Sequence, residues 1–430
     1  MPKHLLEKKG RTHEALLSYH QSIQTIQRMR QNVKLGDLRQ SFFIDRYDPF
    51  KAVVTLLFDT AGNRQELLEV IDKSKSTTLT EDLKHLHSMA EYLGDTTTAK
   101  ENVYTLVEYF FARDKLLILL TTSKQVEVFT QNLSTAEMSR QVQQFLKSIK
   151  LGDYKSFQEI SHRLYAELLA PVDAYAFAHE SPETLVILPD GPLYLLPFAG
   201  LQDTSGTFLI EKAPVVFAPS RSVFRHCLLG DREPAATSNH TVLLIDGTAG
   251  LPNARDELAQ ISKLYSKDAL ILGAKQLPIP PALLKRTKIL HFSGHAVIRQ
   301  NQPLLLLQEF PKEIYLDCQT IRNWAMPNSE LVNLAGCNTA IGPISEGEAP
   351  WGLIPAFLDA GTHAVLASLM EVDDASTKRL SCRFYDLLHK GLSKAKALQL
   401  AQIDLLNSFR ADRTNKLQSW LPYILVGNPR

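Results

Sequence analysis

The sequence predicts an α/β protein in which a central, mostly parallel sheet is flanked by helices and preceded by a helical segment. Two observations lead to this prediction. From about residue 184 onward, short apolar runs alternate with stretches of helical periodicity. Most of these runs are almost continuously apolar, which is typical of parallel strands buried on both faces. The length of 430 residues leaves room for two or three packed units.

Five of the apolar runs are the predicted strands of the sheet, and the stretches between them include four predicted helices. The strands are 184–188, 241–245, 288–292, 331–334 and 363–368. The helices are 257–265, 353–360, 376–388 and 394–409. In sheets of this kind, ligands and chemistry are found on the loops that follow the carboxyl ends of the strands. Functional side chains are therefore expected directly after these runs.

Residues 1–102 have the periodicity of helices. Apolar residues recur at helical spacing at Ala15, Leu16, Tyr19, Ile23 and Ile26. The residues Ala61-Gly62-Asn63 predict a turn between two further helices. No repeat of about 34 residues can be superimposed on this segment, so a small helical bundle and degenerate solenoid repeats both remain open. Because helical repeats stack into binding surfaces, we expect the segment to regulate the rest or to dock a substrate, and its removal to leave the rest folded.

A change of periodicity near residue 103 marks the second unit, 103–430. Residues 103–111 and 115–120 are rich in β-branched and aromatic residues and predict a β-hairpin. Ser134 and Glu137 have the spacing of a capping box, which predicts a helix from this point. The hairpin and helices of 103–183 lead into the α/β core of 184–430.

The composition excludes several classes of protein. With 47 basic and 46 acidic residues, the net charge of +1 does not indicate a nucleic-acid-binding face. No apolar run approaches the roughly 18 residues that a membrane helix needs, and the first residues lack the apolar core of a secretory signal. The four cysteines are widely separated, unlike a disulfide framework or a zinc knuckle, which favours the cytoplasm.

Two of the predicted strands run into side chains that can do chemistry. One passes through a Ser-Gly pair into His295, and the other passes through an Ala-Gly pair into Cys337. Small residues before each side chain let the backbone approach a ligand closely. If the two strands are neighbours, the imidazole can take the proton of the thiol and later protonate a leaving amine. This arrangement predicts a catalytic pair of His295 and Cys337.

Other interpretations of these residues are weaker. His291 and His295 are four residues apart, as in a helical zinc motif, but this segment is a predicted strand without the intervening glutamate. We therefore expect neither a metal nor an organic cofactor. An isolated cysteine is most often a small core residue, and only the preceding strand-end histidine favours catalysis for Cys337. A nucleotide-binding protein is disfavoured because the chain has neither a G-x-G-x-x-G motif nor a Walker loop.

The segments around both residues resemble the CHAT peptidase family, which is related to caspases and separases and is often attached to tetratricopeptide repeats. The family's H-x-x-x-H-G motif is similar to 291–296, and its L-S-A-C-x-T-A motif is similar to 334–340. Further segments match in order: 188–191, 196–198, 218–220, 347–348, 352–353, 356–358, 360–361, 371–374 and 425–429. The resemblance spans 103–430, with a fainter likeness to a tetratricopeptide repeat over much of 10–90.

This resemblance implies a caspase-like, doubly wound fold and a cysteine endopeptidase. Cys337 would be the nucleophile, and His295 would be the general base and then the general acid. The backbone N–H groups of Cys337, Ala296 and Gly294 would hold the oxyanion. Ala296 and Ala349 replace glycines of the family. Because alanine keeps its N–H group, the first change is compatible with an oxyanion hole, whereas the second is expected to alter substrate fit.

The resemblance also implies a partner and a role. The substrate is expected to be a protein chain added to the sheet as a β-strand. The resemblance implies one dedicated partner that is cut in a bacterial antiviral or cell-death system. A regulatory protein is expected to bind the helical segment. The alternative function is a catalytically inactive caspase-like scaffold that acts as an interaction module, and Ala296 is the feature that favours it.

Three acidic residues are candidates for substrate binding. A carboxylate of Glu348, Asp373 or Asp374 would select Arg or Lys before the cut through a paired charge. The alternative is that these acids cap helices, Asp374 above all, because it precedes a predicted helix.

Overall fold

The computed structural model describes most of the chain. The described residues are 3–31, 47–60, 62–75, 104–113, 115–122, 125–177, 184–229, 241–248, 250–300, 302–309, 311–342, 350–412 and 416–430. The candidate Glu348 and the substituted position Ala349 lie outside them.

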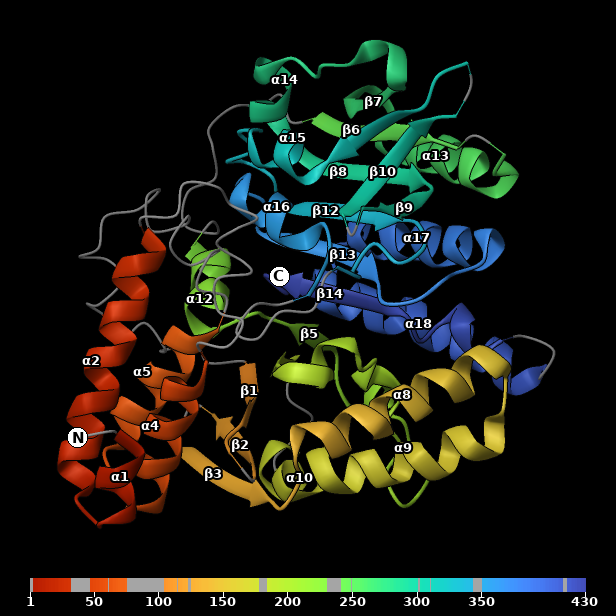
Figure 1. Ribbon diagram of the computed structural model, residues 1–430. Helices are drawn as coiled ribbons and strands as arrows, with labels where there is room; N and C mark the ends of the chain where they lie inside the picture. Colours follow the sequence, from red (N-terminus) through yellow and green to blue (C-terminus); the bar gives the residue numbers. More distant parts are fainter. Residues whose placement is uncertain are drawn as a thin grey trace.

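The described strands form one large sheet and one small sheet (Figure 1). The order in the large sheet is β3 (Val126–Gln131), β2 (Leu116–Thr121), β1 (Tyr104–Phe111), β4 (Thr184–Leu188), β5 (Val215–Phe217), β14 (Tyr423–Gly427), β13 (Ala364–Ser368), β12 (Leu331–Ala335), β8 (Thr287–Gly294), β6 (Thr241–Gly247) and β7 (Ala269–Leu272). The pairs β1–β2, β2–β3 and β13–β14 are antiparallel, and the other neighbours are parallel. The mostly parallel sheet is therefore confirmed.

All five strands predicted for the core are present, within two residues of their predicted ends. Their almost continuous apolar runs are buried, as in β4, β12 and β13. The small sheet, of order β11-β10-β9, is absent from the predicted strands. It consists of β9 (Ala296–Arg299), β10 (Gln302–Gln308) and β11 (Ile314–Asp317), and β9 starts directly after His295. β9 and β11 are short and partly exposed, whereas β10 contains the continuous and mostly buried apolar run 304–307.

The helices of the core follow the strands as predicted. They are α11 (Leu209–Lys212), α12 (Arg221–Leu229), α13 (Pro252–Tyr265), α14 (Pro281–Arg286), α15 (Cys318–Arg322), α16 (Ile354–Asp359), α17 (Asp374–His389) and α18 (Lys394–Ala411). The segment 103–183, which precedes the core, contains α8 (Thr135–Leu151), α9 (Tyr154–Leu168) and α10 (Ala170–Ala176). As the capping-box spacing predicts, Ser134 caps α8 by accepting a hydrogen bond from the backbone N–H of Glu137.

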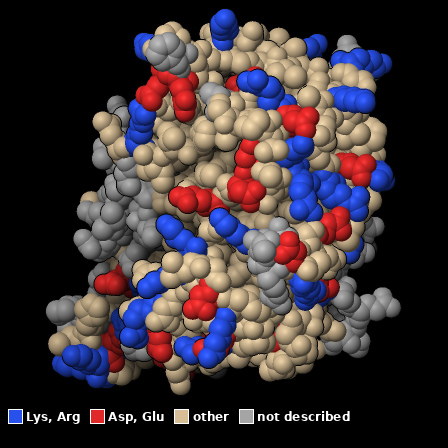
Figure 2. Space-filling view, turned by 90° about the vertical axis from the view of Figure 1, so that its right-hand side faces the viewer, with Lys and Arg blue, Asp and Glu red and all other residues tan. Residues whose placement is uncertain are grey.

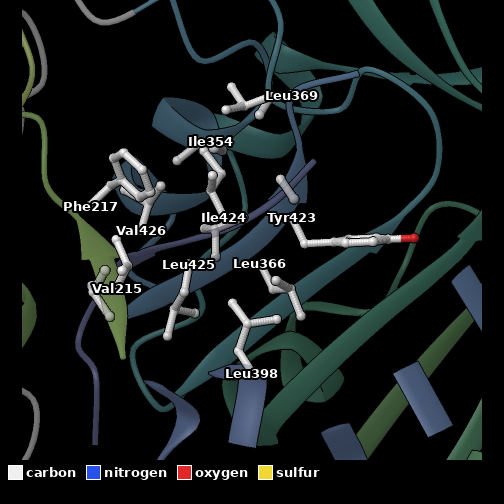
Figure 3. Close-up of a cluster of buried hydrophobic side chains, with 14 of the residues drawn as sticks. Val215, Phe217, Ile354, Leu366, Leu369, Leu398, Tyr423, Ile424, Leu425 and Val426 are labelled. Carbon is white, nitrogen blue, oxygen red and sulfur yellow. The ribbon is translucent and has the colours of Figure 1, made fainter. Parts of the chain in front are cut away.

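The middle of the large sheet is covered on both faces. Successive residues of a strand point to opposite faces, so Ile424 and Val426 of β14 lie on one side and Leu425 on the other. Figure 3 shows the first two on the side of Ile354 of α16, whereas Leu425 points toward Leu398 of α18. All five side chains are buried. Burial on both faces is the arrangement that continuous apolar strands require.

The N-terminal helices pack against the hairpin. They are α1 (Lys3–Lys8), α2 (Thr12–Gln31), α4 (Asp48–Asp59) and α5 (Arg64–Ser74). The predicted turn before α5 is confirmed, because the Asn63 side chain caps that helix by accepting from the N–H of Gln65. The helices share one apolar cluster with Phe110 of β1 and with Leu117 and Leu119 of β2. They therefore cover one face of the hairpin.

A buried ionic cluster joins α5 to the sheet. The ammonium of Lys75, at the end of α5, lies 3.3 Å from the carboxylate of Glu108 in β1 and donates to the carbonyl of Tyr109 at 2.7 Å. Glu108 also accepts from Arg221 of α12 at 2.6 Å. Lys75 is 1% exposed and Glu108 is 0% exposed, so each charge depends on the other for compensation. This packing argues against the expectation that the rest stays folded without residues 1–102.

The described surface carries mixed charge. On the face shown in Figure 2, acidic and basic side chains are interspersed, in agreement with the net charge of +1. Among the helices of the described ranges, none combines the length and the apolar character needed to cross a membrane.

Candidate active site

The two strands that precede the candidate residues are neighbours in the sheet. β8 and β12 are parallel, and Ser293 lies opposite Ala335 in their register. His295 and Cys337 are each two residues further along, so both side chains emerge at the same level of the same sheet edge. The topology therefore brings the predicted pair together at the carboxyl ends of the strands, where chemistry is expected in such sheets.

A row of glycines makes this edge possible. Gly247, Gly294 and Gly336 stand at the ends of β6, β8 and β12. A Cβ atom on Gly294 would lie 2.4 Å from the carbonyl oxygen of Gly247, and one on Gly336 would lie 2.5 Å from that of Gly294. Both contacts are shorter than any real Cβ makes. The small residues before His295 and Cys337 thus allow neighbouring backbones, rather than a ligand, to approach each other.

Cys337 lies in a tight turn after β12. The next residue, Asn338, has φ of +54°, which asparagine tolerates better than most residues. Its N–H donates to the carbonyl of Met370 at 3.1 Å, which ties the turn to the segment after β13. The half-buried Sγ of Cys337 donates to the carbonyl of Val372 at 3.3 Å. The thiol therefore has a hydrogen-bond acceptor other than His295 in this state.

The surroundings of Cys337 favour the neutral thiol. Burial raises the pKa of this thiol, and the nearby carboxylates of Glu371 and Asp373 raise it further because a negative charge disfavours the thiolate. His295, at the same level of the neighbouring strand, is half-buried. A thiol of this kind needs a general base to become a nucleophile.

Replacing Glu371 with Gln should lower the pKa of the Cys337 thiol, because one of the two carboxylates that raise it is removed. The pH profile of Cys337 alkylation by iodoacetamide, followed by mass spectrometry of the modified peptide, should then move to lower pH. Glu330→Gln is a matched control, because Glu330 directly precedes β12, at the opposite end of that strand. An unchanged profile for Glu371→Gln would show that this charge does not act on the thiol.

The structure gives two of the predicted substrate-binding acids another partner. Asp373 caps α17 by accepting from the N–H of Ser376 at 2.8 Å. Asp374 accepts from the backbone N–H groups of Asn253 and Ala254, each at 2.9 Å, and so caps α13. Capping is therefore the observed role of both carboxylates. The sequence suggested capping for Asp374, but on its own helix instead of on α13.

Glu371 is a candidate that sequence reasoning missed. Its side chain is exposed, and it lies next to Val372, the residue whose carbonyl accepts from the thiol. Glu371 has no ion pair or side-chain hydrogen bond with any other described residue. The signal in the sequence is weak: Glu371 belongs to the same acidic run as Asp373 and Asp374. Only the structure separates the capping acids from the free one.

Two of the predicted oxyanion-hole donors lie at this edge. The N–H of Cys337 donates to no backbone carbonyl within the described ranges. Ala296 is the first residue of β9, directly after His295, and its N atom would lie 3.6 Å from a Cβ on Gly336. The Ala296 amide is therefore close to the backbone that precedes the thiol.

The remaining cysteines lie in different surroundings. Burial raises the pKa of Cys227 and of Cys382 to about 12, and Glu257 contributes for Cys382. Cys318 is half-buried, and its Sγ lies 3.9 Å from the carbonyl of Pro303. No group of three or more potential metal ligands occurs within the described part of the chain. Cys337 is therefore the cysteine that the fold places at the strand edge with a histidine.

Comparison with known proteins decides the family. The model of the CHAT domain matches residues 158–428, which is more than half of the chain. The chain belongs to the CHAT domain family. Human tetratricopeptide repeat protein 28 is 22% identical over 321 residues, which are 62% of this chain and 13% of that protein. The chain thus spans about an eighth of the length of this relative.

The fold of this CHAT protein is caspase-like. The structure of Saccharomyces cerevisiae separase with securin aligns over 97% of this chain and 38% of that chain, with a TM-score of 0.59 and 11% identity. Gingipain R, an Arg-specific cysteine proteinase, aligns over 64% of this chain and 67% of that chain, with 13% identity, but the TM-score of 0.39 is too low to support an argument. At such identities the likeness to separase concerns the fold alone.

Proposed function

We propose that this CHAT protein is a cysteine endopeptidase that uses Cys337 and His295. The observation that carries the proposal is the register of β8 and β12, which brings an imidazole and a thiol to one sheet edge. Membership of the CHAT domain family and the fold shared with separase agree with the proposal. Incubation of the purified protein with a peptide library, followed by mass spectrometry of the products, tests the proposal.

The reaction begins with proton transfer. His295 takes the proton of the Cys337 thiol, and the thiolate attacks the carbonyl carbon of the scissile peptide bond. The amides of Cys337 and Ala296, with Gly294 as a further candidate, stabilise the tetrahedral oxyanion. The protonated His295 then gives its proton to the leaving amine, which departs as the C–N bond breaks. Water, activated by the neutral His295, hydrolyses the remaining thioester and restores the thiol.

The substrate is proposed to be a protein chain that binds in extended form across the strand ends. The likeness to a tetratricopeptide repeat protein suggests that the N-terminal helices contribute to partner binding. A role in bacterial defence or cell death, with one dedicated substrate in the cytoplasm, follows from the resemblance of the motifs alone.

The alternative is an inactive scaffold that binds a partner without cutting it. One observation favours it: the thiol donates to the Val372 carbonyl, and the His295 imidazole makes no hydrogen bond to Cys337 in the described structure. Catalytic hydrogen bonds are often misaligned before substrate binds, so this geometry is also compatible with a peptidase. Lack of cleavage of every peptide in the library would favour the scaffold.

We propose Glu371 as a determinant of substrate specificity. Because Asp373 and Asp374 cap helices, Glu371 is the described acid of this loop that can pair with a basic side chain. Peptides with Arg or Lys before the scissile bond should be cleaved roughly tenfold faster than matched peptides with Leu, Met or Asp, and Glu371→Gln should remove the preference. Glu330→Gln is the control. A preference for apolar residues, unchanged by Glu371→Gln, would contradict this assignment and leave the catalytic pair untouched.

A further inference from the structure

A buried polar cluster lies behind the candidate catalytic pair. It consists of Glu257 of α13, His291 of β8, Asn333 of β12 and Tyr385 of α17, and each is at most 2% exposed. His291 and Asn333 face each other in the register of the two strands. Each stands four residues before the candidate catalytic residue of its strand. The cluster therefore joins both catalytic strands to two helices.

The contacts run through all four elements. Nε2 of His291 lies 3.0 Å from Oε1 of Glu257, and its Nδ1 lies 3.2 Å from the hydroxyl of Tyr385. The rings of His291 and Tyr385 also meet edge to face, with centroids 5.4 Å apart. Asn333 lies close enough to the Tyr385 hydroxyl to oppose the rise in its pKa that burial causes. The histidine thus links both helices, α13 and α17, to its own strand.

Stability does not explain this cluster. Within the described residues, neither carboxylate oxygen of Glu257 has an aligned hydrogen bond, and the Nδ2 atom of Asn333 has none either. Burying a carboxylate, an imidazole and an amide in this way is costly, and apolar side chains of similar volume often give a more stable core. Groups that are costly for folding are candidates for a role in function.

Both helices of the cluster begin at the catalytic edge. The carboxylate of Asp374 in α17 accepts from the first N–H groups of α13, so the two helices are joined there. The cap of α17, Asp373, follows Val372, whose carbonyl accepts from the Cys337 thiol. Lys378 of α17 pairs with Asp256 of α13 one turn further along. The helices α13 and α17 and the strands β8 and β12 therefore support the backbone that carries His295 and Cys337.

We propose that Glu257, His291, Asn333 and Tyr385 are positioning residues that set the geometry of His295 relative to Cys337. This inference rests on the proposed function. Four residues of strand separate the cluster from the catalytic pair by about 13 Å, so its members do not touch substrate. They act by fixing β8 and β12 relative to each other, and a displacement of about 1 Å between reacting groups can lower the rate roughly a hundredfold.

The test compares two buried tyrosines. Tyr385→Phe removes the hydroxyl of the cluster, and Glu257→Gln removes its charge with little change in volume. Tyr109→Phe is the matched control, because Tyr109 of β1 is equally buried and its hydroxyl donates to the carbonyl of Leu168 at 3.0 Å, away from β8 and β12. For each variant we would measure the melting temperature, kcat and KM on the best library peptide, and the rate of Cys337 alkylation by iodoacetamide at pH 7.

Positioning predicts a lower kcat, roughly tenfold, with unchanged KM for Tyr385→Phe and Glu257→Gln. Their Cys337 alkylation rates should fall toward that of His295→Ala, whereas Tyr109→Phe should match the wild type whatever its melting temperature. Wild-type kcat and alkylation in both cluster variants would overturn the inference.

Alkylation also separates this inference from the proposed function, because it needs no peptide substrate. If the wild type shows His295-dependent alkylation but cuts no peptide, the proposed endopeptidase function fails while alkylation still decides the positioning role. Alkylation that does not depend on His295 would overturn both.

Discussion

Replacing Cys337 or His295 with Ala should lower the rate of peptide cleavage by at least about a thousandfold. The thiol is the nucleophile and the imidazole activates it, so neither group supports cleavage without the other. For the same reason the double variant should be no worse than either single variant. The melting temperature should change little, because Cys337 is half-buried and its thiol makes one weak hydrogen bond. Cleavage rates and thermal melts of the four proteins check this.

The matched control for this experiment is Cys318→Ala. Cys318 is half-buried like Cys337, but it begins α15 and its Sγ lies 3.9 Å from the carbonyl of Pro303. This variant should retain nearly full activity. Substantial cleavage by Cys337→Ala, or a large loss with Cys318→Ala, would contradict the assignment of the nucleophile.

Deleting residues 1–102 should unfold the remaining chain or leave it aggregated. The truncation exposes Phe110, Leu117 and Leu119, which the N-terminal helices cover, and it removes the Lys75 ammonium from the buried carboxylate of Glu108. Lys75 and Arg221 keep the pKa of Glu108 below its usual value despite burial, which raises it. Circular dichroism of the truncated protein checks this. A truncated chain that melts cooperatively at the temperature of the full chain would contradict it.

A single substitution tests the ionic part of this interface. Lys75→Met keeps the volume but leaves Glu108 with Arg221 as its remaining described cationic partner, and should cost about 3 kcal/mol of unfolding free energy. Lys73→Met is the control on the same helix. Lys73 is 58% exposed and pairs with Glu69 at 3.6 Å, so its loss should cost less than about 1 kcal/mol. Equal losses in urea unfolding would show that the buried pair is not what holds α5 to the sheet.

The catalytic edge was predictable because its signals are local. An apolar run that ends in Ser-Gly-His or Ala-Gly-Cys indicates both a buried strand and a side chain at its end. The alternation of strands and helices predicts parallel strands but not which of them are neighbours. The structure supplies that step by pairing β8 with β12, so that His295 and Cys337 stand at the same level. Helix caps such as Ser134 were equally predictable, since the capping residue and its partner are three residues apart.

The rest depends on contacts between residues far apart in the sequence. Asp374 caps α13, 120 residues away, so nothing near it in the sequence distinguishes a cap from a substrate-binding acid. The same holds for Lys75, whose burial depends on Glu108 and Arg221. His291 was considered only as a metal ligand, whereas its partners Glu257 and Tyr385 come from two other elements. Such pairs become visible only when the fold is known.

Covalent trapping tests most directly whether Cys337 is a nucleophile that His295 activates. The wild-type protein would be incubated with peptides that carry a thiol-reactive electrophile in place of the scissile bond, and the adduct would be located by mass spectrometry. We predict one adduct, on Cys337, that forms far more slowly in His295→Ala and is absent from Cys337→Ala. An adduct on Cys227, Cys318 or Cys382, or equal trapping of Cys337 with and without His295, would contradict the proposed catalytic pair.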